Sequence, residues 1–222
     1  MAHLIITIDG PAGSGKSTMA RLLADRLGAT FLDTGAMYRA VTLAAMQAGV
    51  DMTDEDQLLD VLDSRKFKFT AQKDKMSASI DGVDVTDLIR EPEVTASAWH
   101  IASSPRMRAK LVEMQRQFAD GEEKIVTEGR DQGTVAFSEA NVKFYLIADA
   151  AERARRRQAE LKAKGNSESL EQIQKAIEKR DETDRGRAVG PLKPASDAIV
   201  VDTTDLSIEE AVGKLLSFVK QK

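Results

Sequence analysis

Short apolar runs alternate with amphipathic stretches along most of the 222-residue chain. Five runs are short and rich in apolar or β-branched residues, which is typical of buried strands. They cover residues 5–8, 31–33, 124–128, 142–148 and 198–202. Between them apolar residues recur at helical spacing, as at Ala20, Leu23 and Leu27. Strands separated by helices predict an α/β fold, with a five-stranded parallel sheet covered by helices on both faces.

The pattern changes between Phe67 and Val85, where apolar and polar residues alternate with the period of a half-exposed strand. Asp81 and Gly82 stand between two such runs and are typical of a two-residue hairpin turn. We therefore expect a small antiparallel β meander inserted into the α/β chain.

A glycine-rich segment follows the first apolar run directly. Gly10, Gly15, Lys16 and Ser17 fit the pattern G-x-x-x-x-G-K-[ST] of a phosphate-binding loop. Glycines let backbone N–H groups approach phosphate oxygens, and the following helix adds its positive dipole end. We expect Lys16 to neutralise the β- and γ-phosphates and the Ser17 hydroxyl to bind Mg²⁺. The bland alternative is a glycine-rich turn with a chance lysine. The expected ATP-binding residues are Gly10, Pro11, Ala12, Gly13, Ser14, Gly15, Lys16, Ser17 and Thr18.

Other polar segments follow the second and third strands, at 33–39 and 129–131. Ligands of parallel sheets bind beyond the carboxyl ends of the strands, so these segments and the loop at 10–17 are expected to converge.

Arginines are abundant beyond the loop. Phosphoryl transfer between two anions needs many cations, and the planar guanidinium group binds phosphate oxygens in pairs. Neither histidine, His3 or His100, lies in a strand-end motif. An acceptor that is itself a monophosphate needs no general base, because its second pKa of about 6 leaves it mostly dianionic at neutral pH. An alcohol acceptor stays open, with Asp33 or Asp131 as its base.

Composition narrows the class of protein. A net charge of −4 argues against a general nucleic-acid binder. The absence of cysteine excludes disulfides and thiol chemistry, and no apolar run is long enough to span a bilayer. No basic segment precedes an apolar one at the N-terminus, so we expect no signal peptide and a cytoplasmic location. No long exposed apolar face is evident, which favours a monomer.

Several motifs in order resemble those of bacterial-type cytidylate kinases, a family of nucleoside monophosphate kinases. The opening segments 8–18 and 32–39, the later segments 129–135, 152–157 and 180–187, and the stretch 191–198 carry the likeness over nearly the whole chain. The resemblance implies ATP- and Mg²⁺-dependent phosphorylation of CMP or dCMP. It also implies a core of residues 1–34 and 104–222, an inserted monophosphate-binding region at 35–103, and a short lid at about 153–165.

The resemblance further implies a role for each matching residue. Thr34, Arg39, Arg130 and Arg187 would hold the acceptor phosphate. Arg180 and Asp184 would face the sugar hydroxyls, and Arg108 and Asp131 would recognise the cytosine edge, beside Tyr38. The residues expected to act in catalysis are Lys16, Arg130, Arg153, Arg157 and Arg187. One position departs from the family pattern, because Trp99 stands where a base-contacting serine is expected.

Structural explanations compete with some of these roles. The arginines at 153–157 could form a solvated helix face, and Arg180, Asp184 and Arg187 a surface ion-pair stripe, although the glycine and proline that follow favour a loop there. Trp99 fits packing better than base stacking.

Three other functions compete with phosphorylation of CMP. One is a P-loop kinase for UMP, dTMP or an alcohol such as shikimate. Another is a GTPase switch or regulatory nucleotide-binding module, which the lack of an N-K-x-D pattern disfavours. The third is a structural α/β protein with a vestigial loop, which the intact Lys16-Ser17 pair disfavours.

Overall fold

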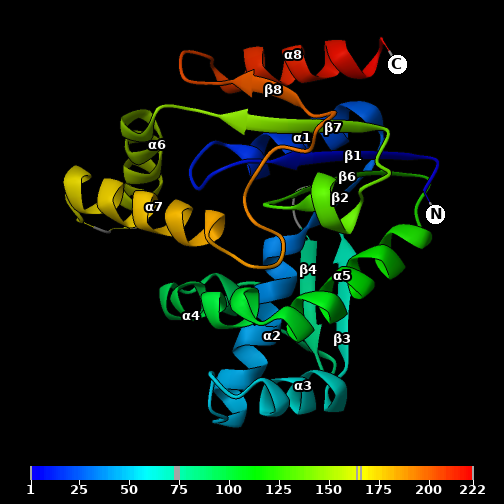
Figure 1. Ribbon diagram of the computed structural model, residues 1–222, viewed down its shortest axis with the longest axis vertical. Coiled ribbons are helices and arrows are strands. Elements are labelled where there is room, and N and C mark those ends of the chain that lie inside the picture. Colours follow the sequence, from blue (N-terminus) through cyan, green and yellow to red (C-terminus); the bar gives the residue numbers. More distant parts are fainter. Residues whose placement is uncertain (1, 73–75, 164, 166, 222) are drawn as a thin grey trace.

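A computed structural model of the protein describes residues 2–72, 76–163, 165 and 167–221. Its centre is a five-stranded sheet in the order β2-β6-β1-β7-β8, in which every neighbouring pair is parallel (Figure 1). The strands are β1 (Leu4–Asp9), β2 (Thr30–Asp33), β6 (Lys124–Gly129), β7 (Val142–Ile147) and β8 (Ile199–Asp202). The predicted parallel α/β fold is confirmed.

Helices cover both faces of this sheet because successive side chains of a strand point to opposite sides. Ile6 and Ile8 of β1 pack into a cluster with α1 (Lys16–Leu27) and α8 (Ile208–Val219). Ile5 belongs to the other cluster, with α2 (Thr34–Ala48) and α5 (Pro105–Asp120). The edge strands β2 and β8 leave β1 at the centre, directly before the phosphate-loop motif.

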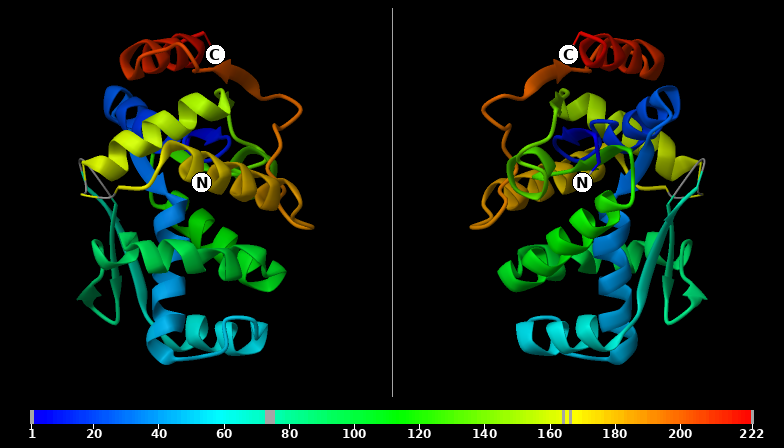
Figure 2. Two further views of the ribbon diagram at one scale, coloured as in Figure 1. Left: turned by 90° about the vertical axis from the view of Figure 1, so that its left-hand side faces the viewer. Right: turned by 90° about the vertical axis from the view of Figure 1, so that its right-hand side faces the viewer.

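A second, three-stranded antiparallel sheet consists of β3 (Phe67–Ala71), β4 (Met76–Ile80) and β5 (Val83–Asp84). Ile80 pairs with Val83, so Asp81 and Gly82 form the predicted two-residue turn. Met76, Ala78 and Ile80 are buried against the same apolar cluster as α2. Figure 2 shows this sheet beside α2, and β3 and β4 also contact the edge strand β2 of the parallel sheet. The predicted meander is confirmed.

The remaining elements are α3 (Glu55–Ser64), the 3-10 turn η1 (Leu88–Arg90), α4 (Pro92–Ser103), the π-helical turn η2 (Gln132–Ala136), α6 (Ala150–Lys162) and α7 (Leu170–Arg185). Helix α7 extends further than the sequence indicated. The glycine and proline after Arg187 favoured a loop around 180–187, but the helix continues through Asp184 and ends only at Gly186. Burial of Ile173, Ile177, Asp181 and Asp184 on one face holds its last turns in place.

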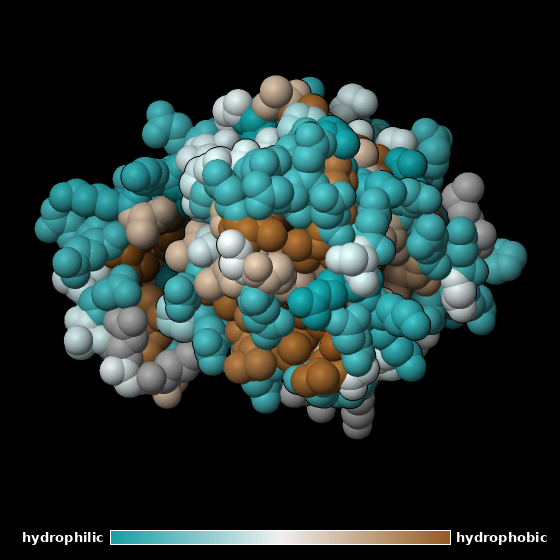
Figure 3. Space-filling view, turned by 90° about the horizontal axis from the view of Figure 1, so that it is seen from below, coloured by the Kyte–Doolittle hydropathy of each residue, from teal (hydrophilic) through white to brown (hydrophobic). Residues whose placement is uncertain are grey.

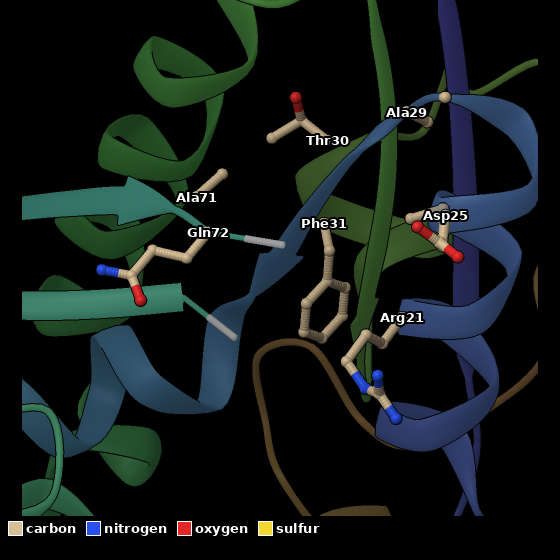
Figure 4. Close-up of a pocket in the computed structure, with 9 residues that line it drawn as sticks. Arg21, Asp25, Ala29, Thr30, Phe31, Ala71 and Gln72 are labelled. Atoms are coloured by element: carbon tan, nitrogen blue, oxygen red, sulfur yellow. The ribbon is translucent and has the colours of Figure 1, made fainter. Parts of the chain in front are cut away.

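Two hollows lie away from the phosphate-loop segment. One, of about 200 Å³, lies at the opposite end of α1, where Phe31 of β2 stands between Arg21 of α1 and Gln72 after β3 (Figure 4). The other, of about 410 Å³, lies between α3, β3 and α5. Seen from below, the end of the molecule that carries α3 shows hydrophobic patches among hydrophilic residues (Figure 3). Among the described residues, no helix is both long and apolar enough to cross a membrane.

Candidate active site

The loop between β1 and α1 has the backbone of a phosphate cradle. Gly10 has a φ of 149°, a conformation that side chains strongly disfavour, and a Cβ there would collide with the carbonyl oxygen of Leu146 on β7. Only glycine therefore fits between the two strands. The loop then leads into α1, whose first turn holds Lys16, Ser17 and Thr18.

The Lys16 side chain folds back into this loop. Its Nζ donates to the carbonyl oxygen of Pro11 at 2.6 Å and lies 3.4 Å from Ser14 Oγ. Lys16 is only 5% exposed, and its burial, together with the positive charge of Arg130, lowers its pKa from 10.5 to about 7. Its ammonium group is therefore stabilised by any anion that enters the loop.

Glu128 completes the donor side of the site and was not chosen from the sequence. Glu128 lies near the carboxyl end of β6, and its Oε1 accepts a hydrogen bond from Ser17 Oγ at 2.8 Å. A hydroxyl beside a carboxylate is an oxygen donor set that suits Mg²⁺. The position directly before the predicted 129–131 segment was the signal that could have pointed to it.

Arg153 and Asp181 hold the loop from the other side. Asp181 Oδ1 accepts from the Ala12 N–H at 2.9 Å, and Arg153 Nη1 donates to the Ala12 carbonyl oxygen at 2.8 Å and also to Asp181. Arg153 is 5% exposed. The structure thus places this predicted catalytic arginine against the loop backbone, where it joins α6 and α7 to the P-loop.

Four arginines from three segments lie within electrostatic range of one another or of Lys16. Arg130 and Arg180 act on Lys16, and Arg39 and Arg187 act on Arg180. Arg130 Nε donates to Asp184 Oδ2 at 2.8 Å, and Arg187 pairs with the other oxygen of Asp184. Arg180 is exposed, and the positive charge of Arg130 is the largest cause that lowers its pKa to about 10, with Arg39 and Arg187 adding to the effect. Because the charge of Arg130 lowers the pKa of both Lys16 and Arg180, a bound anion is favoured here.

Asp33 lies near the guanidinium groups of Arg39 and Arg90. Its Oδ2 is 3.5 Å from Arg39 Nη2 and 3.7 Å from Arg90 Nη2, while its Oδ1 caps α2 by accepting from the Ala36 N–H. Asp33 therefore caps α2 and at the same time lies beside two arginines of the site. Arg90, at the end of η1, was not chosen from the sequence, because nothing local links it to β2.

Arg108 and Asp131 form a buried ion pair, as expected if they act together. Arg108 also donates to the Ala102 carbonyl oxygen at 3.3 Å, and its guanidinium carbon lies 5.9 Å from the centre of the Tyr38 ring. Burial raises the pKa of Tyr38 to about 12, so this phenol stays neutral. Gly190 covers the pair, and a Cβ there would collide with both charged groups.

Three other predicted residues are placed differently. Thr34 is buried, and its hydroxyl donates to the Glu128 carbonyl oxygen at 2.7 Å. Arg157 is largely exposed and pairs with Glu160 of its own helix at 2.9 Å, so its predicted catalytic role finds no contact with the loop in this conformation. Trp99 was expected to pack against the protein instead of stacking on a base. It is 53% exposed, and its ring stacks on that of His100 with ring centres 3.8 Å apart.

Comparison with known proteins now decides the family. The family model described as cytidylate kinase matches residues 6–221. The chain belongs to the cytidylate kinase family. Proteins named cytidylate kinase from Stutzerimonas stutzeri and Carboxydothermus hydrogenoformans are both 46% identical to it, over 98% of the chain and 96% and 97% of their own lengths. The cytidylate kinase of Mannheimia succiniciproducens is 43% identical over 99% of the chain and 97% of its own length.

Solved structures support the fold of this cytidylate kinase family member. A shikimate kinase from Bacteroides thetaiotaomicron superposes with a TM-score of 0.52 at 13% identity, covering 98% of each chain. A gluconokinase from Sinorhizobium meliloti gives a TM-score of 0.51 at 14% identity, covering 98% of this chain and 92% of its own. At such low identity the likeness shows the fold alone.

Proposed function

We propose that the protein transfers the γ-phosphoryl group of ATP to CMP, and also to dCMP, giving ADP and CDP or dCDP. The observation that carries this proposal is the ring of cations, Arg39, Arg130, Arg180 and Arg187, between Lys16 and the Arg108–Asp131 pair. Two anions placed end to end require such a ring, because repulsion between them otherwise opposes their approach. The names of the relatives fit the same reaction.

On the donor side, N–H groups within residues 10–18 surround the ATP phosphates, except at Pro11, which has no N–H, and at Ala12, whose N–H already donates to Asp181. Lys16 exchanges its hydrogen bond to Pro11 for the phosphate oxygens, which return its pKa toward the ordinary value. Ser17 and Glu128 are the residues that would hold Mg²⁺, which neutralises phosphate charge when it is bound. The described residues contain no group of three or more acidic or histidine side chains that could hold a metal.

On the acceptor side, the phosphate of CMP attacks as a dianion and loses no proton, so no general base is required. Arg39, Arg130 and Arg187 hold its oxygens, and the dipole at the start of α2 adds to the attraction. Thr34 now donates its hydroxyl proton to the Glu128 carbonyl oxygen, and it would turn that proton to the phosphate, which as a dianion can only accept.

Recognition of the base falls to Arg108 and Asp131. The Asp131 carboxylate accepts from the cytosine amino group, and Arg108 donates to the ring nitrogen or carbonyl oxygen. Uracil carries N3–H and O4 instead, which reverses part of this pattern. Arg180 and Asp184 lie on the last turns of α7, within the same cluster, and face the sugar.

Two parts of the chain are proposed to close over the substrates. They are the inserted region at 35–103 and the lid at about 153–165; residues 73–75 and 164 of these ranges lie outside the described residues. Closure excludes water from the phosphoryl group and so prevents its hydrolysis. The cytoplasmic location and the monomeric state also stay predictions. Gel filtration with light scattering measures the oligomeric state.

A panel of acceptors tests the proposal directly. CMP, dCMP, UMP, AMP, dTMP and shikimate are compared at fixed ATP and Mg²⁺ by release of ADP. We expect CMP and dCMP to give the highest kcat/KM by more than tenfold. Preferential turnover of UMP, dTMP or shikimate would reject CMP as the substrate, and absence of turnover with every acceptor would reject the kinase assignment for this panel.

A further inference from the structure

Asp9 is a buried carboxylate to which the proposed reaction gives no role. It is the last residue of β1, directly before Gly10, and is 4% exposed. Its Oδ1 accepts from the Gln132 N–H at 2.8 Å and its Oδ2 from the Gly133 N–H at 2.7 Å. Each oxygen therefore holds one backbone group of a segment more than 120 positions away in the chain.

Those two N–H groups are the first two of η2. The first N–H groups of a helical turn have no partner inside it, and a carboxylate at the residue before the turn ordinarily accepts from one of them. Asp131 occupies that preceding position, yet its side chain makes no capping hydrogen bond and pairs with Arg108 instead. Asp9 thus takes the capping role that Asp131 would otherwise fill.

We propose that Asp9 is a positioning residue for the acceptor base: by capping η2 from β1, it leaves the Asp131 carboxylate free to face the substrate. The inference rests on the proposed function, since it assigns Asp131 to cytosine. The proposal also links the two substrate sites. β1 leads into the ATP-binding loop, and its last residue holds η2, which directly follows the proposed base-binding residue Asp131.

The charged surroundings of Asp9 make this capping sensitive to pH. Burial raises its pKa from 3.8 to about 7, and the negative charge of Asp131 acts in the same direction, while the two backbone hydrogen bonds and Lys16 oppose it. Tyr145 of β7 also lies within electrostatic range. Below pH 7 the carboxyl gains a proton, and one of its two oxygens becomes a poorer acceptor.

The test begins with Asp9→Asn, which keeps one acceptor oxygen, and Asp9→Ser, which is smaller. We expect KM for CMP to rise about tenfold or more, the size of one lost hydrogen bond to a charged group, and the preference for CMP over UMP to fall. KM for ATP should change less than threefold. Thr7→Val is the matched control, because Thr7 is buried on the same strand and its hydroxyl has no hydrogen-bond partner among the described residues. It should leave both KM values unchanged.

A double-mutant cycle with Asp131→Ala separates positioning from a purely structural role. If Asp9 acts through Asp131, Asp9→Asn adds less than about threefold to KM for CMP once Asp131 is already alanine. The pH profile gives a second readout at saturating ATP. As the pH drops through about 7, kcat/KM for CMP should fall more in the wild-type protein than in Asp9→Asn. Protonation of the CMP phosphate lowers kcat/KM equally in both proteins, so the difference reports Asp9.

Additive effects in the cycle, equal losses for ATP and CMP, or identical pH profiles would overturn the proposal. Failure of both Asp9 variants to fold, judged by circular dichroism and thermal unfolding, would assign Asp9 to the fold and overturn it as well. Activity of the wild-type protein on CMP is measured in the same series. Its absence would reject the proposed function instead, so the two failures are distinguishable.

Discussion

At the scale of single residues, nearly every proposed substrate-binding cation is paired with a carboxylate of the protein. Arg130 and Arg187 share Asp184, Arg108 pairs with Asp131, and Arg39 lies beside Asp33. Burying unpaired charges is costly, so these carboxylates keep the cations in place before a phosphate arrives. Lys16 differs, because among the described residues its Nζ is hydrogen-bonded to neutral oxygens, those of Pro11 and Ser14.

Replacement of Lys16 by alanine removes the ammonium group that is proposed to contact the β- and γ-phosphates. We expect kcat to fall about 10²- to 10³-fold, the usual cost of losing one electrostatic contact to the transferred group, with CMP affinity nearly unchanged. Initial rates and calorimetric titration with CMP measure the two effects. Unchanged turnover would refute the role given to Lys16.

The lowered pKa of Lys16 predicts a pH dependence of ATP binding. In the free protein the amine loses its proton as the pH rises through about 7, while bound phosphate restores the charged form. ATP binding should therefore take up a proton above pH 7 and weaken as the pH rises from 7 to 9. Calorimetry in two buffers of different ionisation enthalpy measures this uptake. Equal binding heats at pH 8.5 would contradict the prediction.

Asp131→Ala removes the proposed acceptor of the cytosine amino group and leaves Arg108 buried without its partner. KM for CMP should rise, and the ratio of kcat/KM between CMP and UMP should fall about tenfold or more. Steady-state kinetics with both acceptors give the ratio. Preserved selectivity would show that the base is recognised elsewhere.

At the scale of elements, the ends of β1, β2 and β6 and the helices that follow them hold the site. Asp33 caps α2, Asp149 caps α6, and Ser169 caps α7 with a capping box. Each cap fixes where a helix starts and hence where its arginines lie. Gly10 fixes where β1 ends and the loop begins, because only glycine fits beside Leu146 at that backbone conformation.

Gly10→Ala tests how tightly the sheet and the loop are matched. Because the new Cβ would collide with the Leu146 carbonyl oxygen and the backbone there has a φ of 149°, we expect loss of ATP binding and a lower midpoint of thermal unfolding. Gly213→Ala is the matched control on α8, where a Cβ meets no atom within 4 Å. The free energy of unfolding of that variant should rise by about 0.5–1 kcal/mol, because alanine has a higher helix propensity than glycine. Normal ATP affinity in Gly10→Ala would contradict the close fit.

At the scale of the whole molecule, the apolar cluster below the parallel sheet continues without a break into the inserted region. Ile125 of β6, Met37 of α2 and Met76 of β4 belong to the same cluster. Movement of the insert must therefore preserve most of these contacts, which favours a hinge at the ends of α2 and α5 over separation of two cores.

The single tryptophan reports such a movement. Trp99 is 53% exposed on α4 within the inserted region, one helical turn before the Ala102 carbonyl that binds Arg108. Closure over CMP and a non-hydrolysable ATP analogue should cover the indole and shift its emission to shorter wavelength. Excitation at long wavelength avoids absorption by the nucleotides, and Trp99→Phe provides the blank. An unchanged spectrum in the ternary complex would contradict closure of this region.

Local pattern determined much of this protein. The strands, the meander turn at Asp81 and Gly82, and the phosphate loop were predictable because burial, turn chemistry and glycine geometry act within a few residues. Helix α4 and the far end of α7 were not, since packing against α2 and the buried face of Asp181 and Asp184 override weak local signals.

The sequence by itself therefore settled that a parallel sheet carries a phosphate loop and an arginine-rich edge, because those features are written in neighbouring residues. Only the tertiary structure decided which charges meet. The partners of Ala12, Asp9 and Arg130 lie 169, 124 and 54 positions away, and no local preference selects among so many carboxylates and backbone groups. Packing of the strand ends selects them, which is why Glu128, Arg90 and the capping role of Asp9 emerged only from the fold.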